Sequence, residues 1–229
     1  MAEHTNEIAV YLEIGDKRTF ACALEWPGWS RGGPDEEAAL LALYEYGQRY
    51  ARAIEGAQVG FTVPSSVSVF RIVERLKGDA TTDFGAPAAT PARDLEPVDE
   101  AELERFQALL QSCWRAFDAA VRTAEGRELR KGPRGGGREL EKIIRHVRES
   151  EAAYLSSLGW KHKLGEGKDL SAELRRDRSA TLEGLTRAAL GELPAYGPRG
   201  GRHWKPRQFV RRVAWHVLDH AWEIEERIS

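Results

Sequence analysis

Two histidines near the C-terminal end of the chain have the spacing of metal ligands. His216 and His220 are four residues apart, which places both imidazoles on one face of an α-helix, about one turn apart. Both fall on the apolar stripe that Phe209, Val213 and Val217 mark on this helix. An unpartnered imidazole is costly to bury, so two buried rings indicate a shared ligand.

A third histidine can reach the same point from another helical segment. If helices begin near residues 138 and 206, His146 and His216 lie about 12 and 15 Å from the helix starts. We expect these two helices to run parallel in a bundle, which would place all three rings at one level of the core. Ser150 and Ala153, which follow His146 on the same face, leave room for a metal or a ligand.

Three neutral imidazoles suit Zn²⁺, Ni²⁺, Cu²⁺ or Fe²⁺, and they leave a coordination position for water or substrate. We therefore predict one divalent metal ion per chain, with Zn²⁺ as the first expectation and Ni²⁺ or Fe²⁺ as alternatives. The simpler interpretation is that the helical pair arises by chance and that His146 is an ordinary core or surface histidine. His4, His162 and His203, which fall in a tail and in loops, are not assigned as ligands.

The segment that carries these histidines reads as four amphipathic helices. Asp99 followed by Glu102 resembles a capping box at the start of the first, and apolar residues recur every three or four positions to Val121. Similar periods mark a second helix to about Leu158, a weaker third around 174–185 and a fourth after residue 206. The pattern predicts an up-down four-helix bundle over residues 98–229.

The N-terminal part has a different pattern. Residues 7–14 and 19–25 alternate as strands around a turn, an acidic helix start follows Pro34, and 67–73 reads as a further strand. This order predicts a small antiparallel sheet with one helix packed on it. Apolar periodicity then disappears over residues 77–97, which we interpret as a linker. The fold class is therefore α+β, with domains at 1–76 and 98–229.

Composition excludes several classes of protein. Residues 1–97 carry a net charge of −6 and residues 98–229 a net charge of +4, neither of which is the strong positive field that nucleic-acid binding requires. No apolar run is long enough to span a membrane, and the polar start predicts a cytoplasmic protein. Cys22 and Cys113 form neither a disulfide framework nor a CxxC motif, so we expect small core residues.

The histidine segments resemble the DinB superfamily of metal-binding four-helix bundles. The matching residues are Ile143-Ile144-Arg145-His146-Val147 and Trp215-His216-Val217-Leu218-Asp219-His220, and the resemblance covers about residues 98–226. It implies a divalent metal at the three histidines. It also implies metal-assisted activation of a low-molecular-weight thiol, such as mycothiol, bacillithiol or glutathione, for transfer or isomerisation on a small molecule.

The N-terminal region is similar to the HicB antitoxin fold over about residues 7–75. The similarity rests on Phe20 to Glu25, Trp26-Pro27-Gly28 and the helix start Asp35-Glu36-Glu37-Ala38-Ala39-Leu40. A separate DNA-binding region of the kind antitoxins often carry does not follow it. The resemblance therefore implies a docking or dimerising module, and hence a homodimer, more than a repressor.

Two similar loops precede the histidine-bearing helices. Gly132-Pro133-Arg134-Gly135-Gly136 recurs as Gly197-Pro198-Arg199-Gly200-Gly201. If the two helices are parallel, both loops lie at one end of the bundle, where Arg134, Arg138, Arg199 and Arg202 could bind the carboxylates or phosphates of a substrate or thiol. Ordinary flexible connections are the alternative.

Two functions are consistent with these features. The first is a metal-dependent enzyme, a thiol transferase, isomerase or hydrolase, that acts on a small molecule by Lewis-acid activation of a thiol or water. The second is a non-catalytic, metal-stabilised interaction or antitoxin-like protein. An open metal position beside a pocket would favour the enzyme, and a closed one would favour the structural role.

Overall fold

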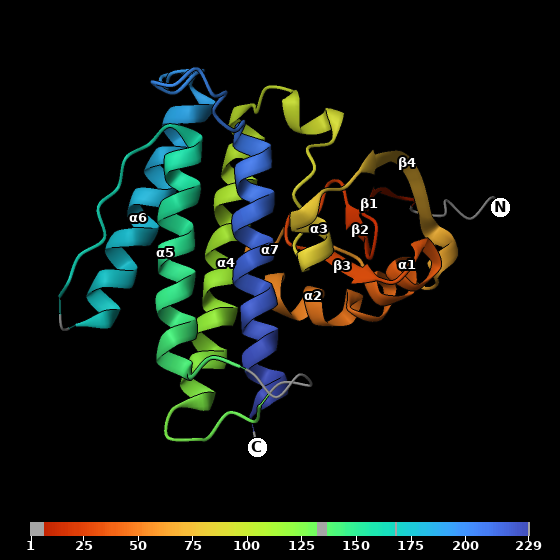
Figure 1. Cartoon of the computed structure of the whole chain (residues 1–229), viewed down its shortest axis with the longest axis horizontal. Helices are drawn as coiled ribbons and strands as arrows, with labels where there is room; N and C mark the ends of the chain where they lie inside the picture. The colour runs from red at the N-terminus through yellow and green to blue at the C-terminus, as the bar shows by residue number, and fades with distance from the viewer. Residues whose placement is uncertain (1–6, 132–136, 168, 229) are drawn as a thin grey trace.

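The structure, a computed structural model, describes residues 7–131, 137–167 and 169–228. It is mixed α+β, as expected, with a four-stranded sheet in the N-terminal third and seven α-helices among the described residues. Figure 1 shows the four longest helices side by side, next to the sheet and its own shorter helices. No helix in these three ranges is both long and apolar enough to cross a membrane.

The sheet is mixed, so the expectation of an antiparallel sheet is wrong. Strands β1 (Ile8–Ile14), β2 (Thr19–Ala23) and β3 (Ser30–Gly33) are antiparallel neighbours, whereas β4 (Phe70–Lys77) pairs with β1 in parallel. The chain passes through two helices before it returns to the free edge of β1, and such a crossover produces a parallel pair. The expected 67–73 strand is shifted, since Val67–Val69 is a 3₁₀ turn.

The predicted N-terminal helix is two helices, α1 (Glu36–Glu45) and α2 (Gly47–Ile54), which meet at Tyr46. The helix start is confirmed, because the Asp35 side chain accepts a hydrogen bond of 2.8 Å from the backbone N–H of Ala38. Helix α1 packs against β2 and β3 and therefore covers one face of the sheet.

Both faces of the sheet are buried. Val10 and Leu12 of β1 belong to the main core, whereas Tyr11, which points to the opposite face, packs in a second cluster with Phe20 and Trp215. Trp215 lies on the last helix of the chain. The second face of the sheet is therefore covered by an element from the other end of the sequence.

The helices expected after residue 98 are present as α4 (Glu100–Ala124), α5 (Leu140–Leu158), α6 (Leu170–Ala189) and α7 (Pro206–Arg227). Asp99 caps α4 by accepting from the backbone N–H of Glu102 at 2.8 Å, as expected. The Glu102 carboxylate does not complete a capping box but pairs with Arg93 and Arg207.

The directions of these helices differ from the expected up-down order. The C-terminal ends of α5 and α6 and the N-terminal ends of α4 and α7 line one cavity, so α5 and α6 run opposite to α4 and α7. The connection over 159–167 runs back along the helices in Figure 1. Eleven residues separate the end of α5 from the start of α6. Eleven extended residues can span roughly 36 Å, more than the length of α5, about 28 Å.

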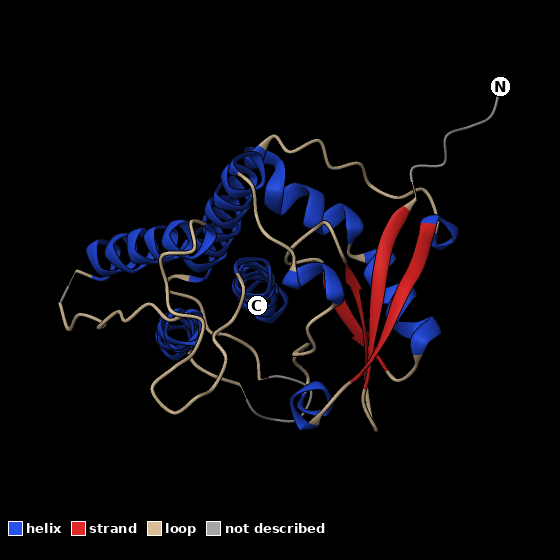
Figure 2. Ribbon diagram, turned by 90° about the horizontal axis from the view of Figure 1, so that it is seen from above, coloured by secondary structure: helices blue, strands red, loops and turns tan. Residues whose placement is uncertain are grey.

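Helix α7 is the central element of the molecule. Seen from above in Figure 2, it lies between the other long helices and the sheet, and most of its residues are buried. The expected linker folds against it: the segment contains α3 (Ala80–Phe84) and a 3₁₀ turn at Ala92–Leu95. Within that turn, the fully buried Asp94 forms an ion pair with Arg211, at 2.6 Å and 3.0 Å.

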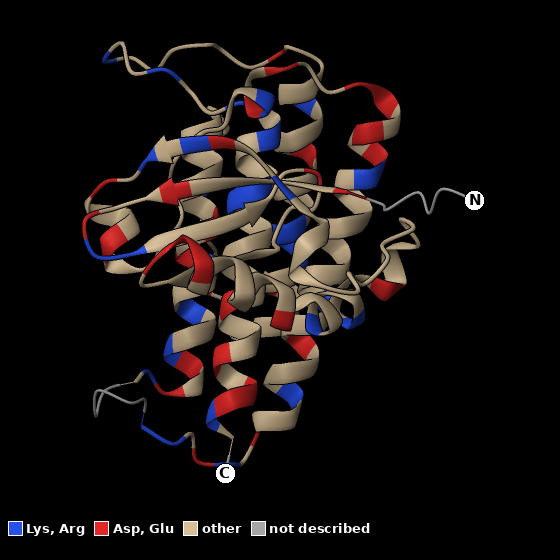
Figure 3. Cartoon of the chain, turned by 90° about the vertical axis from the view of Figure 1, so that its right-hand side faces the viewer, with Lys and Arg blue, Asp and Glu red and all other residues tan. Residues whose placement is uncertain are grey.

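A single core cluster extends from Val10 of the sheet to Ile224 of α7. Further polar links join the two parts, among them the ion pairs of Arg31 with Asp219 and of Arg49 with Glu225. A division into domains at 1–76 and 98–229 stays a prediction. On the side seen in Figure 3, basic and acidic residues are interspersed along the helices.

Candidate metal centre

The three histidines singled out by the sequence converge in the structure. One possible ligand atom from each of His146, His216 and His220 lies within 4.8 Å of the other two. His146 comes from α5 and the other two from α7. The predicted match in depth from the two helix starts is wrong, because α5 and α7 are antiparallel. Instead, His146 is about 9 Å from the start of α5 and His220 is about 10 Å from the end of α7, so the rings meet at one level.

The spacing of the rings fits one metal ion. The Nε2 atoms of His216 and His146 are 3.2 Å apart. A Zn²⁺ ion has Zn–N distances of about 2.0–2.1 Å, which places two tetrahedral ligand atoms about 3.3 Å apart. The centroids of the three rings are 4.6 to 5.0 Å from one another. Donor type and spacing therefore both suit a divalent cation that accepts imidazole nitrogen.

A carboxylate orients one of the rings. His220 Nδ1 lies 2.7 Å from Glu223 Oε2, and the other oxygen of Glu223 accepts a 2.7 Å hydrogen bond from Arg227 Nη1. Arg227 is in turn fixed by the backbone carbonyl groups of Arg130 and Arg138. This pairing holds the proton of His220 on Nδ1 and leaves Nε2 free, the arrangement that commonly supports a metal-bound histidine.

The electrostatics favour the neutral form of His146 and His216 and the charged form of Glu223. Burial, followed by the neighbouring His220 and His146, lowers the pKa of His216 well below its ordinary value. Burial and then Arg138 and His220 lower the pKa of His146. Burial favours the neutral form of Glu223, but its bonds to His220 and Arg227 outweigh this and lower its pKa. Neutral imidazoles are the form that binds metal.

The rings are largely shielded from solvent. His216 and His220 are 6% and 8% exposed, whereas His146 is only partly buried. The ring of Tyr154 packs edge-on against His216, with centroids 5.6 Å apart. His216 Nδ1 is buried and has no hydrogen-bond partner in the part of the chain that the structure describes.

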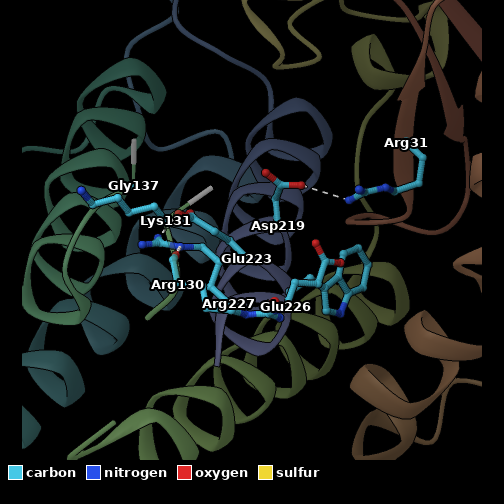
Figure 4. A pocket seen from close by; sticks show the side chains of 9 residues that line it. Arg31, Arg130, Lys131, Gly137, Asp219, Glu223, Glu226 and Arg227 are labelled. Atoms are coloured by element: carbon cyan, nitrogen blue, oxygen red, sulfur yellow. Dashed lines mark hydrogen bonds and ion pairs between the residues drawn. The ribbon is translucent and has the colours of Figure 1, made fainter. Parts of the chain in front are cut away.

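A cavity of about 550 Å³ lies beside the Glu223 end of the centre (Figure 4). It is lined by both basic and acidic side chains, and Figure 4 shows the ion pair between Arg31 and Asp219 on its wall. Glu223 is the residue that the cavity and the centre share, because it lines the cavity and also holds His220. Its full lining is Arg31, Arg130, Lys131, Gly137, Asp219, Trp222, Glu223, Glu226 and Arg227.

The four arginines predicted to bind substrate are not brought together. Because α5 and α7 are antiparallel, Arg138 lies at the end where α7 finishes, whereas Arg199 and Arg202 lie at the end where α7 starts. Arg134 and the rest of the first loop fall outside the described residues. The expectation that both loops share one end of the bundle is therefore wrong.

Sequence reasoning missed the residues that surround the histidines. Glu223 follows His220 by three positions and Arg227 follows Glu223 by four, so helical spacing alone could have suggested this chain of contacts. Arg31 comes from the sheet, and no sequence signal links it to α7. His162 and His203 have other partners, namely Asp177 at 2.8 Å and the Pro194 carbonyl at 2.6 Å.

The cysteines are buried and free, as expected, and burial raises the pKa of each thiol to about 12.

No protein-family model, curated protein or solved structure matches the chain. The resemblances to the DinB superfamily and to the HicB fold remain predictions that rest on the residues quoted above.

Proposed function

We propose that this chain is a metal-dependent enzyme of the DinB type that binds one divalent ion through His146, His216 and His220. The observation that carries the proposal is the convergence of three imidazoles, within 4.8 Å, from two helices. The Glu223 carboxylate that orients His220 adds to it. Zn²⁺ is the first expectation, with Ni²⁺ or Fe²⁺ as alternatives.

The reaction we propose is the transfer of a low-molecular-weight thiol to a small molecule, or an isomerisation that uses such a thiol. When bound, the ion supplies Lewis-acid activation, which lowers the pKa of a thiol or water. Three protein ligands leave a position for that group. In the same proposal, α4 to α7 form a DinB-like bundle, and residues 7–75 form a HicB-like docking or dimerising module.

The cavity beside Glu223 supports an anionic thiol. Arg130 and Lys131 lie on its wall together with Arg31 and Arg227. Arg31 and Arg227 are already paired with carboxylates, at 3.0 and 2.7 Å. Arg130 and Lys131 are therefore the cations on which the binding of a thiol such as glutathione, through its carboxylates, depends in this proposal.

A second function is favoured by the burial of the rings. Because His216 and His220 are so little exposed, the metal can act as a structural link between α5 and α7 in a non-catalytic interaction protein. In that case the metal has no position that a ligand can enter.

The test is a titration of Co²⁺-loaded protein with glutathione, bacillithiol and mycothiol, followed by visible and near-ultraviolet absorption. A thiol-activating centre predicts a saturable spectral change with at least one of them, weakened in the double variant Arg130→Met/Lys131→Met. The spectrum without thiol should stay the same in that variant. A Co²⁺ spectrum that no thiol alters would reject thiol activation and leave the structural role.

A further inference from the structure

A second cavity, lined in part by the Tyr154 ring that also packs against His216, has the features of a ligand site. It encloses about 330 Å³ between the second face of the sheet, the 81–94 segment and helices α5 and α7. This volume is near the lower end of the range for small-molecule sites. Its walls come from four separate parts of the chain: Tyr11 of β1, the 81–94 segment, residues 153–157 of α5, and the stretch from Trp204 to Trp215 that leads into α7.

Two buried hydrogen-bond donors on these walls lack a good acceptor. Tyr11 and Trp215 are 0% and 5% exposed, yet within the described residues neither the Tyr11 hydroxyl nor the Trp215 Nε1 has an oxygen or nitrogen partner. The Tyr11 hydroxyl has only the Cys22 thiol beside it, and sulfur is a weak acceptor. Leaving a buried polar group unsatisfied costs about 1–3 kcal/mol. Native proteins rarely leave two such groups at one cavity, so a bound acceptor would account for both.

One cation on the wall also lacks a counter-ion. Arg211 is fully paired with Asp94, but within the described residues no carboxylate lies at ion-pair distance from Arg212. Arg212 donates to the Pro87 carbonyl, and its guanidinium carbon lies 5.4 and 5.1 Å from the ring centroids of Tyr154 and Trp215. Five N–H groups on this side chain allow further hydrogen bonds to an anion.

The rest of the lining is apolar and aromatic. Tyr154 and Trp204 pack with their ring centroids 5.6 Å apart, and Ala153 and Ala88 add small apolar surfaces. An occupant of this cavity therefore meets donors and one positive charge together with flat apolar walls. A carboxylate attached to a ring or a short acyl chain has the matching chemistry.

We propose that this cavity binds a small aromatic or short-chain carboxylate, whose oxygens accept hydrogen bonds from Tyr11, Trp215 and Arg212. The ring or chain lies against Tyr154 and Trp204. The proposal does not depend on a metal at the histidines, because none of its contacts uses them. The bound carboxylate would contact the sheet, α5 and α7 together, so its binding should also stabilise the junction between the two parts of the chain.

The experiment is isothermal titration of metal-free full-length protein with phenylacetate, benzoate and hexanoate, and with phenylacetamide as a neutral analogue. We expect saturable binding of at least one carboxylate at millimolar or lower concentration, and at least tenfold weaker binding of the amide. Arg212→Met should weaken binding by about tenfold or more, the usual effect of losing a charged hydrogen bond. Tyr11→Phe should weaken it several-fold.

Matched variants separate a binding role from a folding defect. Arg122→Met removes an exposed arginine of α4 and Tyr44→Phe removes a hydroxyl elsewhere, and neither should change the affinity. Tyr11→Phe removes a hydroxyl that has no oxygen or nitrogen partner, so the melting temperature of this variant should be unchanged or higher.

The proposal is overturned if no carboxylate binds, if the amide binds equally well, or if Arg212→Met and Tyr11→Phe keep full affinity. Binding unchanged by added Zn²⁺ is the expected result, and a strict requirement for Zn²⁺ would contradict the independence of this site.

Discussion

Glu223 is the residue that turns three nearby histidines into an organised centre. Its carboxylate holds His220 on one side and Arg227 on the other, at 2.7 Å each. Glu223→Gln should lower the affinity for Zn²⁺ by roughly 10- to 100-fold, because an amide holds the ring less strongly and makes its free nitrogen less basic. Competition with a coloured chelator measures this affinity.

Glu225→Gln is the control, since Glu225 lies on the same helix but is exposed and pairs with Arg49. It should leave the affinity for Zn²⁺ unchanged. Equal affinities of the Glu223 variant and the unmodified protein would mean that Glu223 does not support the centre.

Glu151 should make stability depend on pH. It is buried on α5, accepts a hydrogen bond of 2.6 Å from Trp114 Nε1, and burial raises its pKa from 4.5 to about 7. Between these values the folded state binds more protons than the unfolded state, so stability falls as pH rises from about 4.5 to about 7. The upper limit of this loss is about 3 kcal/mol.

Urea unfolding of metal-free protein at several pH values tests this dependence. Glu151→Gln keeps the acceptor for Trp114 but cannot ionise. The free energy of unfolding of the variant should therefore increase relative to that of the unmodified protein as pH rises. A difference that stays constant over this range would show that Glu151 does not titrate as proposed.

At the residue scale, the sequence was sufficient for the histidine pair of α7 because helical spacing and apolar neighbours are local signals. His216 and His220 could be placed on one face from four residues of spacing. His146 was chosen on the assumption of parallel helices, which is wrong, and it reaches the other two rings because α5 and α7 are antiparallel. Arg31 could not be predicted, since its position beside Asp219 depends on how the sheet packs against α7.

At the scale of elements, one glycine sets the distance between α5 and α6. A Cβ atom at Gly184 would lie 2.8 Å from Leu155 Cδ2 and 3.0 Å from Trp160 Cγ, closer than packed atoms allow. Gly184→Ala should therefore cost about 1–3 kcal/mol from overpacking. Part of this is offset by about 1 kcal/mol of improved helix propensity, so we expect a net loss of about 1 kcal/mol.

Ser179→Ala, at an exposed position of the same helix, is the comparison for helix propensity and should be neutral or slightly stabilising. Both variants are measured by urea unfolding. If Gly184→Ala is as stable as Ser179→Ala, the close contact between α5 and α6 is not required.

The extents of the elements followed from the sequence more closely than their directions. Capping by Asp35 and Asp99 and the apolar periods located the helices. The orientation of α6 and the parallel pairing of β4 could not be predicted, because each depends on a long connection whose path carries no local signal. Ser30–Gly33 forms a strand without any apolar alternation, so it too was missed.

At the scale of the whole molecule, Asp94 and Arg211 join the two parts of the chain. The pair is buried and its Arg211 also donates to the carbonyl groups of Ala23 and Leu24. Asp94→Asn leaves a buried charge without its partner, and we expect it to destabilise the protein by about 3 kcal/mol. Fluorescence and circular dichroism during urea unfolding give the size of the loss.

Glu36→Gln is the matched change, because it breaks the more exposed ion pair with Arg75. Surface pairs contribute at most about 1 kcal/mol, so this variant should be nearly as stable as the unmodified protein. Similar stabilities of the two variants would show that the buried pair is not a principal link between the sheet and α7.

Binding of one divalent metal ion by His146, His216 and His220 can be measured by elemental analysis of the purified, Zn²⁺-reconstituted protein after desalting. We expect about one metal ion per chain, and background levels of metal in folded His216→Ala and His220→Ala. His203→Ala, in which a histidine away from the centre is lost, should retain the full amount. Undiminished metal in either α7 variant, or no metal in the reconstituted protein, would contradict this expectation.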